Sequence, residues 1–182
     1  MDSMPFLLFG ATGDLAKRKI YPALYNLFIN QNIPQSFSII GIGRRAVSDV
    51  EFQTRVEQSL DTFSRTSTDD QSGVKESIGS FHYCQLDTAN TVDYRDLLCL
   101  VKRRETELNI PENRMFYLSV APELFDVIAL NIKESGLWTT KGLKRFIIEK
   151  PFGHNLKSAR ELNAKLSKPF DEGDICCIDH YL

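Results

Sequence analysis

The sequence has little of what secreted, metal-binding or nucleic-acid-binding proteins depend on. Its four cysteines, at positions 84, 99, 176 and 177, show no CxxC spacing, and the chain contains three scattered histidines. This pattern argues against a zinc site and favours reduced thiols in a cytoplasmic protein, so we expect no metal. The net charge of −2 provides no general electrostatic attraction for nucleic acid.

Long apolar runs are missing as well. The N-terminal stretch MDSMPFLLFG carries an acidic residue where a signal peptide has basic ones, and its apolar run is too short for that role. No window of the sequence has the length that a membrane span requires, so we expect no membrane association. The content of 42% hydrophobic and 25% charged residues is that of an ordinary globular chain, and 182 residues suffice for one domain with a core.

The sequence does contain a regular alternation of short apolar runs and helical stretches. The runs predict strands at 6–9, 38–41, 81–86, 115–120, 145–149 and 175–178. The stretches between them predict helices at 14–30, 49–63, 92–108, 122–135 and 158–166. This alternation predicts an α/β fold with a doubly wound, mostly parallel Rossmann-type sheet of about six strands.

Two segments interrupt this pattern. Residues 64–73, SRTSTDDQSG, are polar and lack large apolar side chains, which predicts a loop. Pro22 lies inside the first helical stretch and predicts an end or a kink of that helix near Ile20.

The stretch GATGDLA lies between the first predicted strand and the first predicted helix. Gly10, Gly13 and Ala16 fit a short variant of the glycine fingerprint of dinucleotide-binding proteins. Small residues at these positions would let a diphosphate approach the free amides and the positive dipole end of the helix. A tight turn without a ligand is the alternative, and Asp14 is also an ordinary partner of the helix dipole.

The second predicted strand runs into IIGIGRRAVSD. Folds that bind NAD usually place an acidic residue here for the ribose 2′-hydroxyl, whereas folds that bind NADP prefer arginine for the 2′-phosphate. The sequence has Arg44 and Arg45 at this point and no acidic residue before Asp49. A guanidinium suits a phosphate, so Arg44 is the candidate contact, and Arg45 taken alone is as well explained as a solvated surface residue.

Two further candidate groups follow the fifth and sixth predicted strands. Lys150 in EKPFG comes directly after a buried strand, at the edge of the sheet where open α/β folds bind ligands. His180 and Tyr181 in IDHYL come after the last strand, and both side chains can donate hydrogen bonds to a phosphate. Taken alone, Lys150 is as well explained as a surface lysine, and His180 and Tyr181 as a structural pair. Their predicted position at the same edge of the sheet is what favours a binding site.

Taken together, these motifs resemble the N-terminal coenzyme domain of the glucose-6-phosphate dehydrogenase family. GATGDLAKRKIYPALYNLF at 10–28 is similar to the family's coenzyme loop and first helix, EKPFG at 149–153 to its substrate-lysine motif, and DHYL at 179–182 to the start of its signature motif. The resemblance implies oxidation of β-D-glucose 6-phosphate to 6-phosphogluconolactone, the first step of the oxidative pentose phosphate pathway. NADP would accept the hydride, with NAD less favoured.

The resemblance also implies roles for individual residues. The coenzyme diphosphate would be wrapped by Gly10, Ala11, Thr12, Gly13, Asp14, Leu15, Ala16 and Lys17. Arg44 would meet the 2′-phosphate, and Asp87 and Thr88 would line the adenine side. Lys150 would contact both the substrate and the nicotinamide as the catalytic lysine of this chain, and His180 and Tyr181 would hold the substrate phosphate.

The resemblance further implies what lies outside these residues. We expect residues 1–182 to form one NADP-binding Rossmann domain, because the family's general-base histidine and its β+α substrate and dimerisation domain lie downstream. His82 and His154 do not occupy the position of that base. We therefore expect the chain alone to be inactive, and the complete protein to be a homo-oligomer through the downstream domain.

Two alternatives remain at this point. A sugar oxidoreductase of the glucose–fructose oxidoreductase type also pairs a Rossmann domain with an EKP lysine, although DHYL and the GATGDLAKRK continuation disfavour it. A dinucleotide-binding module without turnover is the non-enzymatic alternative.

Overall fold

The computed structural model describes residues 3–34, 36–64, 71–149, 170 and 172–178. Within these residues, six strands form one sheet in the order β3-β2-β1-β4-β5-β6, and all neighbouring strands run parallel. The strands are β1 (Pro5–Phe9), β2 (Ser38–Gly43), β3 (Phe81–Gln85), β4 (Arg114–Leu118), β5 (Lys144–Glu149) and β6 (Ile175–Ile178). The doubly wound Rossmann-type α/β fold predicted from the sequence is confirmed.

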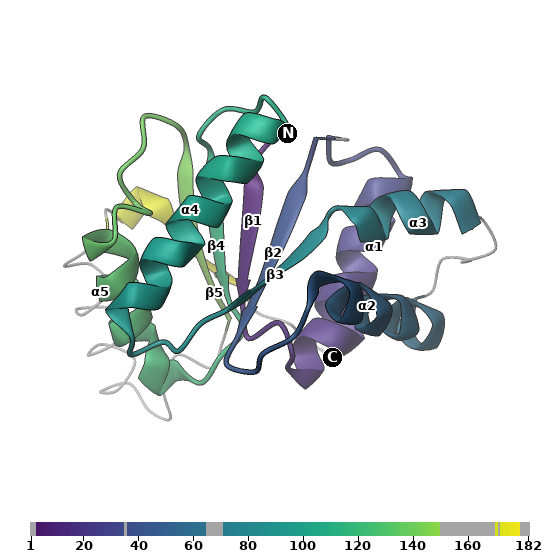
Figure 1. Ribbon diagram of the computed structural model, residues 1–182, viewed down its shortest axis with the longest axis horizontal. Helices are drawn as coiled ribbons and strands as arrows, with labels where there is room; N and C mark the ends of the chain where they lie inside the picture. Colours follow the sequence, from purple (N-terminus) through teal and green to yellow (C-terminus); the bar gives the residue numbers. More distant parts are fainter. Residues whose placement is uncertain (1–2, 35, 65–70, 150–169, 171, 179–182) are drawn as a thin grey trace.

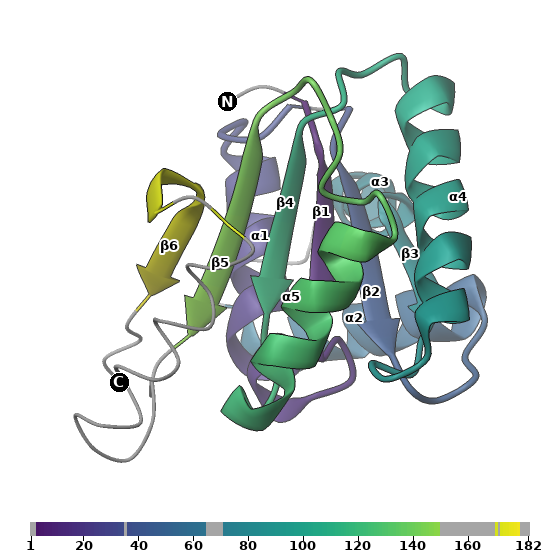
Figure 2. The ribbon, with the colours of Figure 1, turned by 90° about the vertical axis from the view of Figure 1, so that its left-hand side faces the viewer.

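Helices cover both faces of this sheet (Figure 1). The helices are α1 (Tyr21–Ile29), α2 (Asp49–Phe63), α3 (Gln71–Gly79), α4 (Thr91–Glu107) and α5 (Phe125–Glu134), with short turns η1 (Ala16–Ile20), η2 (Pro122–Leu124) and η3 (Glu172–Asp174). Figure 2 shows α4 and α5 in front of the sheet and α1, α2 and α3 behind it. The molecule therefore has three layers, with one hydrophobic core on each side of the sheet.

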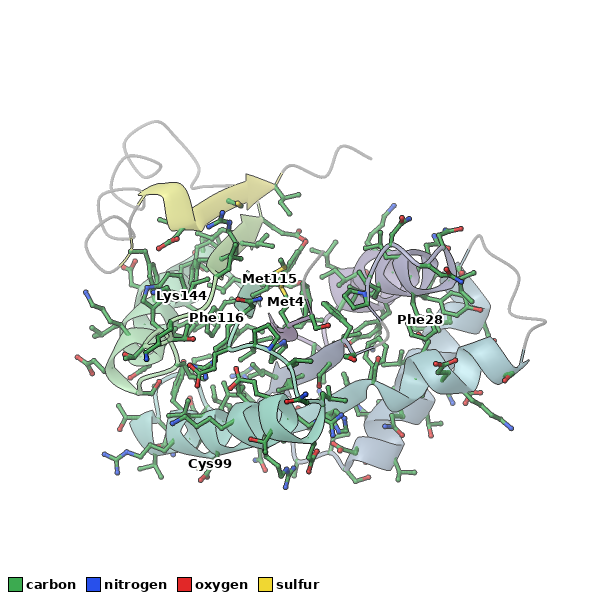
Figure 3. All side chains as sticks on the ribbon, turned by 90° about the horizontal axis from the view of Figure 1, so that it is seen from above. Met4, Phe28, Cys99, Met115, Phe116 and Lys144 are labelled. Carbon is green, nitrogen blue, oxygen red and sulfur yellow. The ribbon has the colours of Figure 1, made fainter. Side chains whose placement is uncertain are left out.

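Strand β1 contributes to both cores because successive side chains of a strand point to opposite faces. Phe6 and Leu8 belong to the core that also contains side chains of α1, α2 and α3, whereas Leu7 and Phe9 belong to the core formed with α4 and α5. All five residues of β1 are buried, as expected for a central strand of a parallel sheet. Phe116 of β4 lies in the second of these cores, in the interior of the molecule (Figure 3).

The described elements match the predicted ones within a residue or two at their ends, except that helix α3 was not predicted. The predicted loop at 64–73 is wrong at its C-terminal end, because residues 71–73 form the start of α3. The physical reason is that Val74 and Ile78, one helical turn apart, are buried against the first core and hold this polar segment as a helix. The predicted helix at 158–166 lies outside the described residues.

The first helix changes its geometry where Pro22 was expected to disturb it. Residues of η1 form a π-helical turn, in which the amide of Tyr21 donates to the carbonyl of Ala16, and α1 then continues with Pro22 in its first turn. In that wide register residue 22 would donate to the carbonyl of Lys17, but proline has no N–H. The hydroxyl of Ser59 in α2 donates to the Lys17 carbonyl instead. The predicted disturbance near Ile20 is therefore a change of helical register and not an end of the helix.

The carboxyl ends of all the strands lie at one edge of the sheet (Figure 2). The strand order reverses at β1, which pairs with β2 on one side and with β4 on the other. In open α/β sheets the crevice outside such a reversal point is the usual place for a ligand. The loop after β1 therefore lies where a ligand site is expected.

Candidate functional site

The loop after β1 begins with a glycine that no other residue could replace without strain. Gly10 has φ of +84°, and a Cβ atom there would overlap the backbone carbonyl of Ser119, which follows β4. The amides of Gly10 and Ala11 donate to the carbonyl of Ile42 at 3.0 and 3.1 Å, which ties the loop to the end of β2. Gly10 therefore lies between the carboxyl ends of β2 and β4, the two strands that flank β1.

Gly13 lies in a different environment from Gly10. Its amide donates to the Gly10 carbonyl at 2.9 Å and closes the turn, and a Cβ atom at this position would meet that same oxygen at 3.0 Å. Apart from atoms of its own chain neighbours, no other heavy atom of the described residues lies within 4 Å of that Cβ position. The side of Gly13 that faces away from the turn is therefore open to a ligand. The helical turn that starts at Asp14 presents its first amides, which lack intrahelical partners, beside this opening.

The glycine loop is held from the protein side by buried aromatic and small residues. The hydroxyl of Tyr21 donates to the Ala11 carbonyl, and burial raises the pKa of Tyr21 far above its ordinary value, so this donor stays protonated. Ala11 and Ala16 are buried, and a Cβ atom at Gly41 would collide with the ring of Phe52 and lie 2.9 Å from the Cβ of Ala11. These contacts hold the loop against the core from its inner side.

The remaining predicted residues of this loop do not all face the opening. Asp14 and Leu15 line an open hollow of about 940 Å³ along the outer side of the first helix, where Asp14 pairs with Arg18 at 2.9 Å. The guanidinium of Arg18 also lies 5.3 Å from the centre of the Phe63 ring. Lys17 is exposed, and Thr12 is half-buried beside Gly43 at the end of β2.

The loop after β2 contains the two predicted arginines. Arg44 and Arg45 are exposed, and neither side chain has a carboxylate within ion-pair distance among the described residues. The first acidic residue after β2, Asp49, accepts a hydrogen bond from the Tyr83 amide at 2.7 Å, and its other oxygen lies 2.9 Å from Nδ1 of His82. Asp49 is therefore engaged with β3, while the two guanidinium groups are available to an anion.

The loop after β3 contains Asp87 and Thr88, which the sequence analysis placed on the adenine side. Asp87 is exposed and accepts from the amide of Ala89 at 3.0 Å. The Thr88 carbonyl accepts from the hydroxyl of Tyr94 at 3.0 Å and from the side-chain amide of Asn131 at 3.1 Å. These bonds fix the loop at the same edge as the glycine loop, and its contact with adenine stays a prediction.

The structure adds a segment that the sequence analysis did not include. The chain leaves β4 through Ser119, whose amide donates to the Phe9 carbonyl at 3.0 Å and whose carbonyl excludes a side chain at Gly10. The strand predicted at 115–120 includes this segment, so its close contact with the glycine loop was missed. Pro122, which starts the next helical turn, was the available signal that the strand ends earlier.

The fifth and sixth strands lead to the other predicted residues. Glu149, the last residue of β5, accepts a hydrogen bond from the hydroxyl of Tyr117 in β4. Burial and this neighbour raise the pKa of Tyr117 far above its ordinary value. Lys150, His180 and Tyr181 lie outside the described residues, so their assignments stay predictions.

The described residues contain neither a His, Cys, Asp and Glu cluster suited to a metal ion nor a helix that could cross a membrane. Cys84, Cys99 and Cys176 are free; Cys84 is buried, and Cys99 and Cys176 are exposed. Figure 3 shows Cys99 on the outer side of α4.

Comparison with known proteins places this arrangement in a family. Residues 7–182 match the family described as "Glucose-6-phosphate dehydrogenase, NAD binding domain". The glucose-6-phosphate 1-dehydrogenase of Bacillus subtilis is 42% identical over 176 residues, which cover 97% of this chain and 35% of that protein. The enzyme of Leuconostoc mesenteroides is 40% identical over 174 residues, which cover 96% of this chain and 35% of that protein. The chain thus spans about a third of the length of these curated relatives.

Solved structures agree with the sequence comparison. A glucose-6-phosphate dehydrogenase in complex with its substrate glucose-6-phosphate superposes with a TM-score of 0.90 at 33% identity, over 99% of this chain and 37% of that one. The glucose-6-phosphate 1-dehydrogenase of Mycobacterium avium superposes with a TM-score of 0.81 at 28% identity, over 97% of this chain and 36% of that one. The chain therefore belongs to the family of the NAD-binding domain of glucose-6-phosphate dehydrogenase.

Proposed function

We propose that this chain binds NADP along the carboxyl edge of its sheet, as the coenzyme domain of an enzyme that oxidises β-D-glucose 6-phosphate to 6-phosphogluconolactone. In this proposal residues 1–182 form one domain. The observation that carries the proposal is the glycine loop at the point where the strand order reverses. The exposed Arg44 and Arg45 follow the neighbouring strand β2, and Asp49 is already hydrogen-bonded to β3.

The preference for NADP rests on the loop after β2. A NAD site needs a carboxylate that can accept from the ribose 2′-hydroxyl, whereas a 2′-phosphate needs a cation. Asp49 accepts from the Tyr83 amide at 2.7 Å, so its carboxylate is turned toward β3. Arg44 and Arg45 are exposed at the same edge and provide the positive charge. NAD is expected to bind more weakly because it lacks the group that these arginines would hold.

The glycine loop provides the second part of the site. The open side of Gly13 and the first amides of the helical turn at Asp14 fit an anion such as a diphosphate. The stretch from Gly10 to Lys17 would wrap this group, while Tyr21 holds the loop from below. The proposal therefore assigns the diphosphate to backbone donors and the 2′-phosphate to side chains.

Bound NADP supplies a nicotinamide ring that can accept a hydride. Lys150 follows Glu149 directly, and the proposal assigns it to the substrate and the nicotinamide, with His180 and Tyr181 on the substrate phosphate. His82 lies near the amino end of β3, against Asp49 and away from the carboxyl edge, so it is not assigned as the general base. The proposal therefore expects coenzyme binding without turnover from these 182 residues.

Calorimetric titration of the purified chain with NADP and with NAD tests the coenzyme assignment. We expect saturable binding of NADP with a lower Kd than that of NAD. Binding of neither dinucleotide would overturn the assigned site, and tighter binding of NAD would overturn the role of the arginines. These two results are distinguishable because the glycine loop is shared by both coenzymes.

The absorbance of NADPH, followed with the purified chain, NADP and glucose 6-phosphate, tests the catalytic part. We expect no sustained increase above the blank. Sustained production that survives removal of contaminating host enzyme would mean that a general base lies within these residues. That outcome would make the chain a complete catalyst and would leave the coenzyme assignment intact.

A further inference from the structure

The loop between β2 and α2, which holds Arg44 and Arg45, is bonded to side chains of the edge strand β3. The hydroxyl of Tyr83 donates to the Arg45 carbonyl at 2.9 Å. The side-chain amide of Gln85 donates to the Arg44 carbonyl at 3.2 Å. Consecutive peptide groups of the arginine pair are thus each held by one side chain of the neighbouring strand.

The register of the sheet explains why these two side chains reach the loop. Gly43 at the end of β2 pairs with Gln85 at the end of β3. Tyr83 lies two residues before Gln85, and residues two apart in a strand point to the same face. Both side chains can therefore extend past the end of β2 to the carbonyl groups that follow it.

Gly43 leaves the space that the Tyr83 hydroxyl needs. A Cβ atom at Gly43 would lie 2.6 Å from the hydroxyl oxygen of Tyr83. The ring of Tyr83 is itself fixed, because it is 8% exposed and packs on Phe52 with ring centres 5.1 Å apart. The hydroxyl that bonds the Arg45 carbonyl therefore belongs to a side chain whose ring has little rotational freedom.

The bonds to the carbonyl groups leave both guanidinium groups available. Burial raises the pKa of Tyr83, so its hydroxyl remains a donor at neutral pH. Fixing the peptide groups lowers the entropy that the loop would lose when an anion binds, because the arginines are already presented at one edge. A mobile loop with the same arginines would bind the same anion more weakly.

We propose that Tyr83 and Gln85 are positioning residues for the coenzyme 2′-phosphate, acting through the backbone of Arg44 and Arg45. This inference rests on the proposed NADP function and assigns part of the coenzyme selectivity to β3, which itself need not touch the phosphate. Loss of either hydrogen bond makes the backbone of Arg44 and Arg45 less well fixed, and it weakens the binding of NADP more than the binding of NAD.

The test compares Tyr83→Phe and Gln85→Ala with the unchanged chain, by calorimetric Kd values for NADP and for NAD. Tyr83→Phe removes the hydroxyl and keeps the ring on Phe52, and Gln85 is exposed, so both variants should fold. We expect each to raise the Kd for NADP by about 3- to 10-fold, the range of one lost hydrogen bond. The Kd for NAD should change by less than about twofold, since NAD has no 2′-phosphate.

Gln53→Ala is the matched control. Its side-chain amide also donates to a backbone carbonyl of β3, that of Phe81 at 2.8 Å, but at the other end of the strand. A general loss of β3 stability would appear in this variant too. We expect Gln53→Ala to leave the ratio of the two Kd values unchanged, and thermal unfolding of all variants reports their folding.

A double-mutant cycle decides whether Tyr83 acts through the arginines. In a chain that carries Arg44→Ala and Arg45→Ala, adding Tyr83→Phe should no longer change the Kd for NADP. Equal weakening of NADP and NAD by Tyr83→Phe, or an undiminished effect in the double-alanine chain, would overturn the inference. If the unchanged chain does not prefer NADP at all, the proposed function fails, and the inference fails with it. If the chain prefers NADP but neither β3 variant alters the preference, the inference alone fails.

Discussion

Arg114 and Glu105 form a buried ion pair at the amino edge of the sheet, opposite the candidate coenzyme site. The guanidinium donates to both carboxylate oxygens, at 2.7 and 2.9 Å, and to the carbonyl of Leu137 at 2.9 Å. The two side chains are 1% and 6% exposed. This pair joins the end of α4 to the start of β4 and to the segment after α5.

Breaking this pair should destabilise the fold without altering coenzyme selectivity. We expect Glu105→Ala to lower the free energy of unfolding by about 3–5 kcal/mol, because it leaves a buried guanidinium without its counter-ion. The exposed pair of Arg55 with Glu51 provides the control, and Glu51→Ala should cost less than about 1 kcal/mol. Urea unfolding measures both. Similar values for the two variants would show that burial does not govern the strength of the first pair.

Arg44→Ala should weaken the binding of NADP much more than the binding of NAD. Loss of a charge-assisted contact with the 2′-phosphate should cost about 1.5–3 kcal/mol in the binding free energy of NADP. Arg103→Ala removes another exposed arginine, from α4, and controls for the change in net charge. Calorimetry provides the dissociation constants of both coenzymes for the unchanged chain and for each variant. Equal losses for both coenzymes in Arg44→Ala would refute the assignment of Arg44.

Gly10 and Gly13 should respond differently to the same substitution. Gly10→Ala should lower the free energy of unfolding by more than about 2 kcal/mol, because the Cβ atom meets the Ser119 backbone at a positive φ. Gly13→Ala should leave a folded chain that binds both coenzymes poorly, and Gly13→Val should bind them less still. Thermal unfolding and NADP titration separate these effects. A folded Gly13→Val chain with normal affinity would show that the loop does not hold the diphosphate.

Ser59→Ala should destabilise the first helix through its contact with the Lys17 carbonyl. We expect a loss of about 1–2 kcal/mol in the free energy of unfolding, since the carbonyl then lacks a donor. Pro22→Ala restores an N–H at position 22, so the double variant should lose less than the sum of the two single changes. Thr62→Ala removes an exposed hydroxyl that donates to the Gln58 carbonyl at 2.8 Å, and should change stability by less than about 0.5 kcal/mol.

The thiol of Cys84 should react slowly and should make stability depend on pH. Burial, and then the charges of Asp96, Asp93 and Asp49, raise the pKa of Cys84 from 9.0 to about 11. At pH 8 roughly one thousandth of this thiol is ionised, so iodoacetamide should modify the exposed Cys99 well before Cys84, as peptide mass spectrometry can show.

The raised pKa of Cys84 also lowers the stability of the folded chain at alkaline pH. The unfolded thiol loses its proton near pH 9 and the folded one near pH 11, so the free energy of unfolding falls as the pH rises between these values. Cys84→Ala should reduce the slope in this window and leave the slope between pH 6 and 8 unchanged. Chemical unfolding at a series of pH values provides the measurement. An unaltered slope would assign the pH dependence to the buried tyrosines.

The central strands were predictable because they contain continuous apolar runs such as PFLLF in β1 and FII in β5, and a parallel sheet buries both faces of its strands. The edge strand β3 (FHYCQ) is less apolar, and its position between two helical stretches is what indicated it. The helix α3 was missed because its fold comes from only two buried apolar side chains, Val74 and Ile78, within a polar segment. For the site, the glycine loop and Arg44 follow from local spacing, which a sequence displays directly. The bond between Tyr83 and the Arg45 carbonyl depends on the register of two strands that are far apart along the chain, and no local pattern indicates it.

The central place of β1 has a consequence for how the chain folds during synthesis. Its neighbours are β2, which starts at residue 38, and β4, which starts at residue 114. At translation rates of roughly 5–20 residues per second, the second edge of β1 waits on the order of 5–20 seconds for its partner. During this interval an apolar strand with open backbone groups can pair with another nascent chain. Slower elongation between β2 and β4 should therefore increase aggregation of newly made chains, even though the finished sheet buries every residue of β1.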